Sequence, residues 1–553
     1  MRQEPTDVLI VGSGAGGSTL AYALTARGAS VRILEKGSDH RLPDFLHKDE
    51  IKFARRNFFV PYPSDEPHMV RVGDEAVFRR SSEGWIANVV GGGTTHMGGF
   101  LLRLHPNDLL GRSKLGVPSG STVEDWPLDF AELEVWYDRV EALLGVSGRA
   151  GDNPFEGPRS NPFPLPPLLE HPLAKPLEAT AKKLGWHPFT TPRAVLSQPF
   201  DGRSSCSYSG FCGSYGCDTG AKGSVIYTVL PKAEATGKCQ LVPNTMAAEI
   251  LVDEKGRAKG VRSIDRDANE RVDLARVVVL SASSVESARL LLASKSSLFP
   301  DGLANGSGLV GRNLTFSSFA SVFADFHVGG KAKLSGLDNP LPWIGRSVQD
   351  FYEKSSKFSH RKGGTLRFDL IHPNPIFRAE HVAFAGADPL FGRELKAALA
   401  AHFHGMKTAE CEVFAEFLPN PDTLVSLDPE VRDKFGLPVA RIQVRQHPET
   451  VAATGALADK AAELFDAMQA DSVRTETRSG ITWVLQHGTC RFGRDPQTSV
   501  LDPNCRAHDV PNLFVVDGSF MPTSGGVPTT LTIQANALRV GEHLAGALVK
   551  KDL

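Results

Sequence analysis

The stretch DVLIVGSGAGGSTLAYALTARGASVRILEKG, residues 7–37, decides the fold of this chain. It opens with a short apolar run, Val8–Val11, typical of a buried parallel strand. Three glycines then follow in the spacing G-x-G-x-x-G: Gly12, Gly14 and Gly17. Apolar residues at helical spacing come next, and a second apolar run, Val31–Leu34, ends in Glu35. The pattern predicts a strand–helix–strand unit with the glycines at its first turn.

Each part of this unit suits the binding of a dinucleotide. The first glycine permits a tight turn, the second lets a pyrophosphate approach the backbone, and the third allows the helix to pack closely on the strand. The helix N-terminus offers N–H groups and a partial positive charge to the phosphates. The terminal acid can accept hydrogen bonds from ribose hydroxyls. We therefore assign a dinucleotide to Gly12, Gly14, Ala15, Gly16, Gly17 and Glu35. These residues leave FAD and NAD both open.

Two further segments extend the same domain. Residues 90–99 read VGGGTTHMGG, where small residues let the backbone approach a flat ring. Residues 276–294 read RVVVLSASSVESARLLLAS, which predicts a buried strand that runs through small residues into a helix. Such a strand can close a sheet over a cofactor bound at the first unit.

Length and composition limit the alternatives. A chain of 553 residues exceeds what one hydrophobic core serves, so we expect at least two domains. The net charge of −2 argues against binding to nucleic acid or to an anionic membrane surface. No apolar stretch approaches the roughly 18 residues of a membrane-spanning helix. The N-terminus enters the first strand too early for a signal peptide, so we expect a cytoplasmic protein.

Together, these segments resemble the glucose–methanol–choline (GMC) family of flavoprotein oxidoreductases. The resemblance also covers EDWPLDFAELEVWYDRVEALLG (124–145), GLVGRNL (308–314) and the block 487–540, which contains HGTCRFG, NLFVVDGS and TLTIQANA. It implies FAD as the cofactor, held also by Gly92, Gly93, Thr95, His96, Ala248, Asp517, Gly518 and Thr530.

The family resemblance implies an α/β fold with two domains. A discontinuous, Rossmann-like FAD-binding domain takes residues 1–115, 205–318 and 485–553. A substrate-binding α+β domain, built on a mostly antiparallel sheet, takes 116–204 and 319–484. Its proline-rich part, 146–204, suggests an extended connection without packed helices. Residues 411–418 and 439–445 alternate as half-buried strands do. One apolar helical face belongs to its core: Leu457, Ala461, Leu464, Phe465 and Met468.

The activity implied by the resemblance is oxidation of the CH–OH group of a sugar or another small alcohol at the flavin. An electron-accepting partner subunit would suit a dehydrogenase of this family. Two rival hypotheses are a flavoprotein lyase or isomerase of the same fold, and a non-catalytic FAD-binding subunit for electron transfer. Fold-level likeness alone does not separate them.

The catalytic base is the point where this chain departs from the family. Removing a hydroxyl proton calls for a base such as imidazole. The family's usual histidine position is Leu485 here, and its second residue, a histidine or asparagine, falls at Pro528. His487 lies two residues later and is our candidate base. Three interpretations stay open: a shorter loop still points His487 at the flavin, another histidine acts, or no deprotonation is needed. Histidines of the second domain that could act are His372, His404 and His447.

Two further features allow more than one interpretation. In part of the family a histidine placed like His96 is bonded covalently to the flavin, whereas other relatives keep it unbonded. Cys206, Cys212 and Cys217 lie in a glycine-rich loop. Three thiolates in such a loop suit an iron–sulfur centre better than zinc. Some family members carry a three-iron [3Fe-4S] cluster on a similar segment, and the alternative is a set of reduced, structural thiols.

Overall fold

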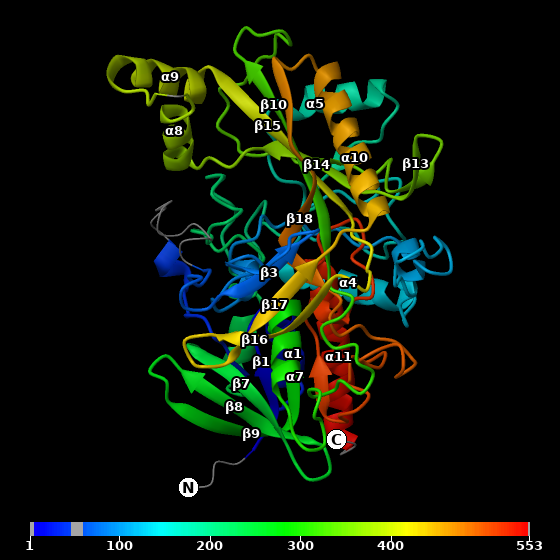
Figure 1. Cartoon of the computed structure of the whole chain (residues 1–553). Helices are drawn as coiled ribbons and strands as arrows, with labels where there is room; N and C mark the ends of the chain where they lie inside the picture. Colours follow the sequence, from blue (N-terminus) through cyan, green and yellow to red (C-terminus); the bar gives the residue numbers. More distant parts are fainter. Residues whose placement is uncertain (1–4, 46–58, 387, 551–553) are drawn as a thin grey trace.

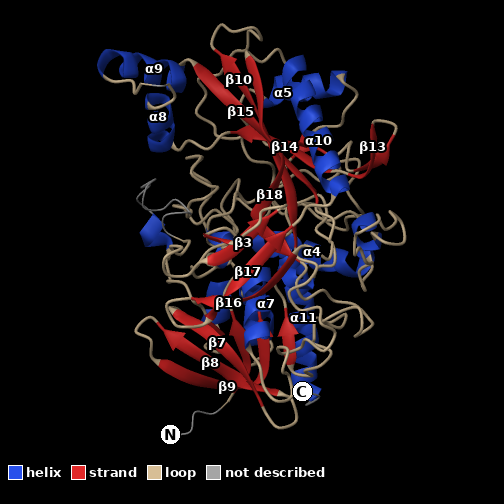
Figure 2. Ribbon diagram, in the orientation of Figure 1, coloured by secondary structure: helices blue, strands red, loops and turns tan. Residues whose placement is uncertain are grey.

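The computed structural model describes residues 5–45, 59–386 and 388–550. Figure 1 shows two sheets at opposite ends of the molecule, and both chain ends lie beside the lower one. The strands drawn in red in Figure 2 make the same division clear. Loops and the short strands between the two ends connect them.

The lower sheet has seven strands with a parallel core, and it confirms the predicted strand–helix–strand unit. Strand β1 pairs in parallel with β2 and with β9, so the two apolar runs at 8–11 and 31–34 lie side by side. The strand order is β6-β2-β1-β9-β8-β7, and β19 pairs with β9. The strands are β1 (Thr6–Val11), β2 (Val31–Leu34), β6 (Cys239–Val242), β7 (Thr245–Val252), β8 (Ala258–Asp265), β9 (Glu270–Leu280) and β19 (Leu513–Val515).

The helices of this part pack around the parallel strands. The first glycine-rich turn opens α1, which contacts α11 along much of its length, and α11 also contacts α4. Strand β9 leads into α7, as the segment 276–294 predicts. The helices are α1 (Ala15–Thr25), α4 (Phe130–Leu144), α6 (Val229–Ala235), α7 (Ser284–Ala293) and α11 (Thr530–Lys550).

The upper sheet has six antiparallel strands in the order β18-β10-β15-β14-β11-β5. The predicted strand at 411–418 is the second half of β15. The strands are β5 (Phe189–Thr190), β10 (Thr315–His327), β11 (Arg346–Val348), β14 (Gly364–Leu370), β15 (Met406–Glu416) and β18 (Ser472–His487). The mixed α/β fold with a separate antiparallel sheet is therefore confirmed.

A long helix, α10 (Pro448–Ala467), covers this sheet and contacts β10, β15 and β18. The predicted apolar face is buried, from Leu457 to Met468 at its end. The expectation of an unpacked connection at 146–204 is wrong in part, because α5 (Ala174–Lys183) forms there and contacts α10. Its proline, Pro176, stands in the first turn, where a helix tolerates the missing N–H.

A four-stranded sheet links the two ends in the order β16-β17-β3-β4. The predicted strand at 439–445 is β17, and it pairs in parallel with β3 from the N-terminal part of the chain. This sheet takes strands from both predicted domains, so it does not mark a boundary between them. The domain boundaries therefore stay a prediction. Its strands are β3 (His68–Val72), β4 (Arg79–Ser81), β16 (Leu424–Arg432) and β17 (Pro438–Val444).

The remaining elements are peripheral or short. A hairpin joins β12 (Glu353–Ser355) and β13 (Phe358–Lys362), and two helices project beside the upper sheet, α8 (Pro375–Ala383) and α9 (Gly392–His404) (Figure 1). Short 3₁₀ turns are η1 (Leu42–Phe45), η2 (Gly92–Thr95), η3 (Pro106–Leu110) and η4 (Gly518–Phe520). Across the described residues, no helix combines the length and apolarity that crossing a membrane requires.

Candidate active site

The turn between β1 and α1 forms one wall of a deep cavity. Gly12 has a φ of +97°, and a Cβ there would overlap the carbonyl of Ser281. A Cβ at Gly17 would overlap the carbonyl of Gly12, so both glycines serve close packing. A Cβ at Gly14 would meet nothing within 4 Å, because it would project into open space. Gly14 is also the N-cap of α1 and has no side-chain cap, so the first N–H groups of the helix are available to an anion.

Glu35 ties the two glycine-rich segments together. Its carboxylate accepts hydrogen bonds from Ser13 N (3.0 Å), Ser13 Oγ (2.6 Å) and Gly37 N (2.7 Å). Ser13 Oγ in turn accepts from the N–H of Gly91 (3.0 Å), next to η2. Burial raises the pKa of Glu35, and the bonds from Ser13 and Gly37 oppose that shift. The acid is thus held at the end of β2, in the cavity wall.

The cavity runs from β7 past the first turn of α1 to the start of α11. Most of the residues assigned to the cofactor line it: Gly12, Gly14, Ala15, Gly16, Glu35, Gly92, Gly93, Ala248, Asp517, Gly518 and Thr530. The lining also includes Val484, Leu485, Gln486 and Thr529. Its wall therefore combines a bare helix N-terminus, a buried acid and small residues.

Three assigned residues lie outside this lining. Gly17 packs the helix on the strand, and Thr95 donates a hydrogen bond to the carbonyl of Val90 (3.1 Å). The ring of His96 stacks on Phe59 with ring centroids 5.9 Å apart. A role for these residues in direct contact with the cofactor stays a prediction.

His487, the last residue of β18, is completely buried and lies outside the cavity lining. Its Nε2 lies 2.7 Å from Oγ1 of Thr529, which does line the cavity. Within the described chain its Nδ1 has no hydrogen-bond partner. Burial lowers the pKa of the imidazole to about 3, so the ring is neutral near pH 7. His487 thus reaches the cavity through the Thr529 hydroxyl.

A bulge in β18 explains this placement. The pairing with β10 shifts between Phe316–Gln486 and Ser317–Thr482, so residues 483–485 leave the ladder. The bulge turns Val484 and Leu485 into the cavity lining. His487 follows where regular pairing resumes, opposite Thr315. The strand therefore presents an apolar residue to the cavity and the histidine to the interior.

The loop that carries Pro528 and Thr529 is held by groups of the upper sheet and of η3. The N–H of Gly526 donates to the Tyr352 hydroxyl (3.0 Å), and Thr365 Oγ1 donates to the Gly526 carbonyl (2.8 Å). Tyr352 donates to the carboxylate of Asp108 (2.7 Å), which also forms an ion pair with Lys362 (2.5 Å). This buried network fixes the backbone that precedes Thr529.

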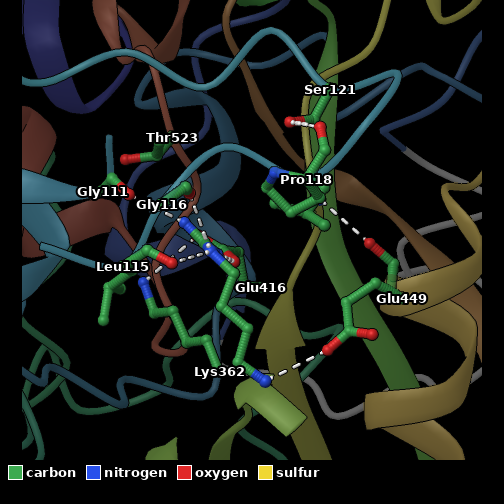
Figure 3. Close-up of polar contacts among 12 residues, drawn as sticks. Gly111, Leu115, Gly116, Pro118, Ser121, Lys362, Glu416, Glu449 and Thr523 are labelled. Carbon is green, nitrogen blue, oxygen red and sulfur yellow. Dashed lines mark hydrogen bonds and ion pairs between the residues drawn. The ribbon is translucent and has the colours of Figure 1, made fainter. Parts of the chain in front are cut away.

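Polar contacts around Glu416 extend that network to the loop 111–121 (Figure 3). Glu416 forms ion pairs with Arg361 and with Lys362. The guanidinium of Arg361 donates to the carbonyls of Gly111, Leu115 and Gly116, at 3.0–3.1 Å. The loop is thereby fastened to β13 and β15.

The cysteine loop, residues 206–217, brings its three thiols against one small apolar cluster that includes Trp343. Burial raises the pKa of Cys206 to about 12, and the other two thiols add to this. Burial also opposes ionisation of Cys217, but Lys222 and hydrogen bonds outweigh it and lower that pKa. In residues 5–45, 59–386 and 388–550, no group of three or more His, Cys, Asp or Glu side chains could hold a metal ion.

The three thiols share one apolar cluster. The tentative assignment of Cys206, Cys212 and Cys217 to an iron–sulfur centre stays a prediction, and so does the alternative of structural thiols. Burial at Cys206 favours the protonated thiol, whereas a metal binds the thiolate, and at Cys217 the lowered pKa favours the thiolate.

The other candidate bases also lie outside the cofactor cavity. His404 is exposed at the end of α9, and His447 caps α10, where its Nδ1 accepts from Glu449 N (3.2 Å). His372 lines a separate, smaller cavity beside Cys212. None of these three side chains lines the cofactor cavity.

Comparison with known proteins identifies the family. Residues 6–317 and 419–537 match the two parts of the GMC oxidoreductase family. The chain belongs to the GMC oxidoreductase family. This GMC oxidoreductase is 31% identical to 6'''-hydroxyparomomycin C oxidase from Streptomyces lividus, over 98% of this chain and 92% of the relative. It is 30% identical to 2-methyl-1,2-propanediol dehydrogenase from Mycolicibacterium austroafricanum, over 98% and 95%.

More distant similarities agree with this placement. The fructose dehydrogenase large subunit from Gluconobacter japonicus is 27% identical, and 98% of each chain is covered. The structure of an R554A variant of formate oxidase from Aspergillus oryzae covers 100% of both chains, with a TM-score of 0.65 and 14% identity. That structure supports the fold alone.

GMC membership implies FAD, and the residues of the cavity fit it. The open space at Gly14 and the bare N-terminus of α1 suit the pyrophosphate. Glu35 stands where ribose hydroxyls need an acceptor. The small residues of η2 and the start of α11 at Thr530 leave room for a flat ring system.

The two positions at which this chain departs from the GMC pattern both lie close in sequence to the His487–Thr529 hydrogen bond. Leu485 and Pro528, the family's usual catalytic positions, are each followed within two residues by a member of the His487–Thr529 pair. Sequence reasoning singled out His487 but missed Thr529. The available signal was the first threonine in VPTTLT, directly after the position that lost its polar side chain.

Proposed function

We propose that this GMC oxidoreductase oxidises the CH–OH group of a sugar or another small alcohol. The names of its relatives support this, because they include an oxidase of hydroxyparomomycin, a propanediol dehydrogenase and a fructose dehydrogenase subunit. FAD, when bound in the cavity, would supply the acceptor for the two electrons. The protein must then supply an acceptor for the hydroxyl proton.

The observation that carries the proposal is the hydrogen bond of 2.7 Å between His487 and Thr529 at the cavity wall. We assign proton removal to this pair. A substrate hydroxyl in the cavity passes its proton to Thr529 Oγ1 while Thr529 passes its own proton to Nε2 of His487. The imidazole is neutral near pH 7 and therefore able to accept. Burial weakens it as a base, so the proton moves only as the C–H bond breaks.

Finer features of the cofactor follow as proposals. The ring of His96 is outside the cavity lining, which supports FAD held without a covalent bond. Acid precipitation would release such FAD into the supernatant. The arrangement of the cysteine loop supports structural thiols in place of a [3Fe-4S] cluster. An electron-accepting partner subunit stays a proposal, supported by a relative whose name describes a large subunit. A cytoplasmic location also stays a proposal.

An anaerobic screen of alcohols and sugars, followed by flavin absorbance, tests the activity. We expect at least one compound to bleach the flavin, and air or a quinone analogue to restore its colour. Product formation without any bleaching would indicate a lyase or isomerase instead. A flavin that no compound bleaches, but that a partner protein reduces, would indicate a non-catalytic electron-transfer subunit.

A further inference from the structure

A second, smaller cavity is lined by residues that follow the glycine-rich segment of the cofactor cavity in sequence. The segment that lines the cofactor cavity at Gly92–Thr94 continues into Gly98 and Phe100, which line the second cavity. Arg193 and Arg367 form part of the same wall, so we call this space the arginine cavity. It measures about 20 Å³, enough for one water-sized polar group.

Aromatic rings and Asp369 hold the two arginines in place. The ring of Phe100 lies between the guanidinium of Arg193 (4.3 Å) and that of Arg367 (3.7 Å). Arg193 also lies over the ring of Trp343 at 4.4 Å. The carboxylate of Asp369 accepts from Arg367 Nη1 (2.9 Å) and forms an ion pair with Arg193. The guanidinium groups are therefore fixed before any ligand arrives.

Three of their nitrogen donors lack an acceptor. Arg193 and Arg367 are 3% and 4% exposed. Arg193 Nε, Arg193 Nη1 and Arg367 Nε are buried and have no hydrogen-bond partner in the described part of the chain. Leaving charged donors buried and unpaired is costly, so this wall calls for an acceptor oxygen.

Charged groups of both signs surround the cavity, since Asp369 pairs with both arginines and Glu412 pairs with Arg367. Burial lowers the pKa of His372 in its wall to about 4, and Arg367, Arg193 and Lys222 lower it further against the opposing effect of Asp369. Burial also raises the pKa of Glu410, the other acid of the lining, so its carboxyl is protonated more readily.

We propose that the arginine cavity binds a carboxylate group of the substrate, so that the substrates are hydroxy acids. One oxygen of a carboxylate is a polar group of this size, and it brings negative charge to donors that arginine presents well. A neutral hydroxyl or amide would accept more weakly from these charged donors. The proposal rests on the proposed oxidation of CH–OH groups, since it assigns the part of the substrate that is not oxidised.

Binding of a simple probe tests the cavity without turnover. Acetate is titrated into the FAD-loaded protein by calorimetry, with acetamide as the uncharged match. Arg193→Gln should weaken acetate binding at least about tenfold, because a charged donor is lost. Arg193→Lys should keep part of the acetate affinity that Arg193→Gln loses, and acetamide binding should be weak in all variants. Arg474→Gln is the matched control, because Arg474 lies half-exposed on β18, away from this cavity.

Flavin reduction by glycerate and by its amide, glyceramide, tests the substrate class. We expect glycerate to reduce the flavin at least about tenfold faster, and acetate to compete with it. Equal rates for the two compounds, or acetate that binds no better than acetamide to the wild-type protein, would overturn the proposal. If neither compound nor any other alcohol reduces the flavin while acetate still binds and Arg193→Gln abolishes that binding, the proposed oxidation fails but the carboxylate site stands. The wild-type titration keeps the test decisive even if Arg193→Gln does not fold.

Discussion

Replacing Thr529 by valine removes one hydroxyl at the wall of the cofactor cavity and nearly keeps the side-chain shape. The change breaks the 2.7 Å hydrogen bond to His487 Nε2. Since His487 Nδ1 has no partner within the described residues, both ring nitrogens would then be buried without one. We expect the loss of one hydrogen bond to a buried group to cost about 1–3 kcal/mol of unfolding free energy.

The larger expected effect is on the reaction. Removing a general base slows a proton-transfer step by about 10²–10⁴-fold, and Thr529→Val disconnects the base from the cavity. Flavin reduction, followed by anaerobic stopped flow with a substrate from the screen, should therefore slow at least about a hundredfold. FAD content and circular dichroism should stay those of the wild type. His487→Gln should slow the step similarly.

A double-mutant cycle decides whether the two residues act together. If the proton passes through Thr529 to His487, the double variant should be about as slow as the slower single variant. If the slowing of flavin reduction in the double variant equals the product of the two single slowings, the residues act independently. A Thr529→Val protein that reduces its flavin within about threefold of the wild-type rate would refute the relay, because the expected loss is about 10²-fold or more. His487 would then merely fill its site.

Cofactor retention, packing, acid stability and metal content can each be tested by one comparison. Glu35→Ala should weaken FAD retention by about 1.5–3 kcal/mol relative to the wild type, measured as FAD released on dialysis, because the ribose loses a charged acceptor. Gly17→Ala should lower the stability of the FAD-free protein by about 1–3 kcal/mol, because its Cβ would overlap the Gly12 carbonyl. Gly14→Ala should leave that stability nearly unchanged but impair FAD binding, and equal melting temperatures for the two alanine variants would contradict this.

The folded pKa of His487, about 3, lies below its ordinary value of 6.5, so the unfolded chain takes up a proton first as the pH falls. Its contribution to stability should therefore drop by about 2 kcal/mol between pH 8 and pH 5, and His487→Gln should show a flatter pH dependence in denaturant titrations. The cysteine loop should carry no iron after anaerobic reconstitution with iron and sulfide. A brown absorbance beyond the flavin bands would show that the thiols rearrange around a cluster.

Local patterns in the sequence determined the cofactor-binding unit. The strand β1, the glycine turn, α1 and β2 lie within residues 6–34, and their apolar spacing and glycine positions depend on near neighbours. The apolar face of α10 is equally local, because its residues recur at helical spacing. Proline content was a poorer guide, since Pro176 sits in the one turn of α5 that tolerates it.

Tertiary structure alone decided the chemistry around the cofactor. A bulge at residues 483–485 turns Leu485 towards the cavity and His487 away from it, and Thr529 joins His487 across 42 residues of sequence. Likewise, Arg193 and Arg367 both contact the ring of Phe100 although 174 residues separate them. Hydrophobic spacing specifies which face of an element is buried, whereas pairing register and contacts between distant segments depend on how the whole chain packs. The FAD-binding unit and the candidate base His487 could therefore be read from the sequence, whereas the contact of His487 with Thr529 and the arginine cavity could not.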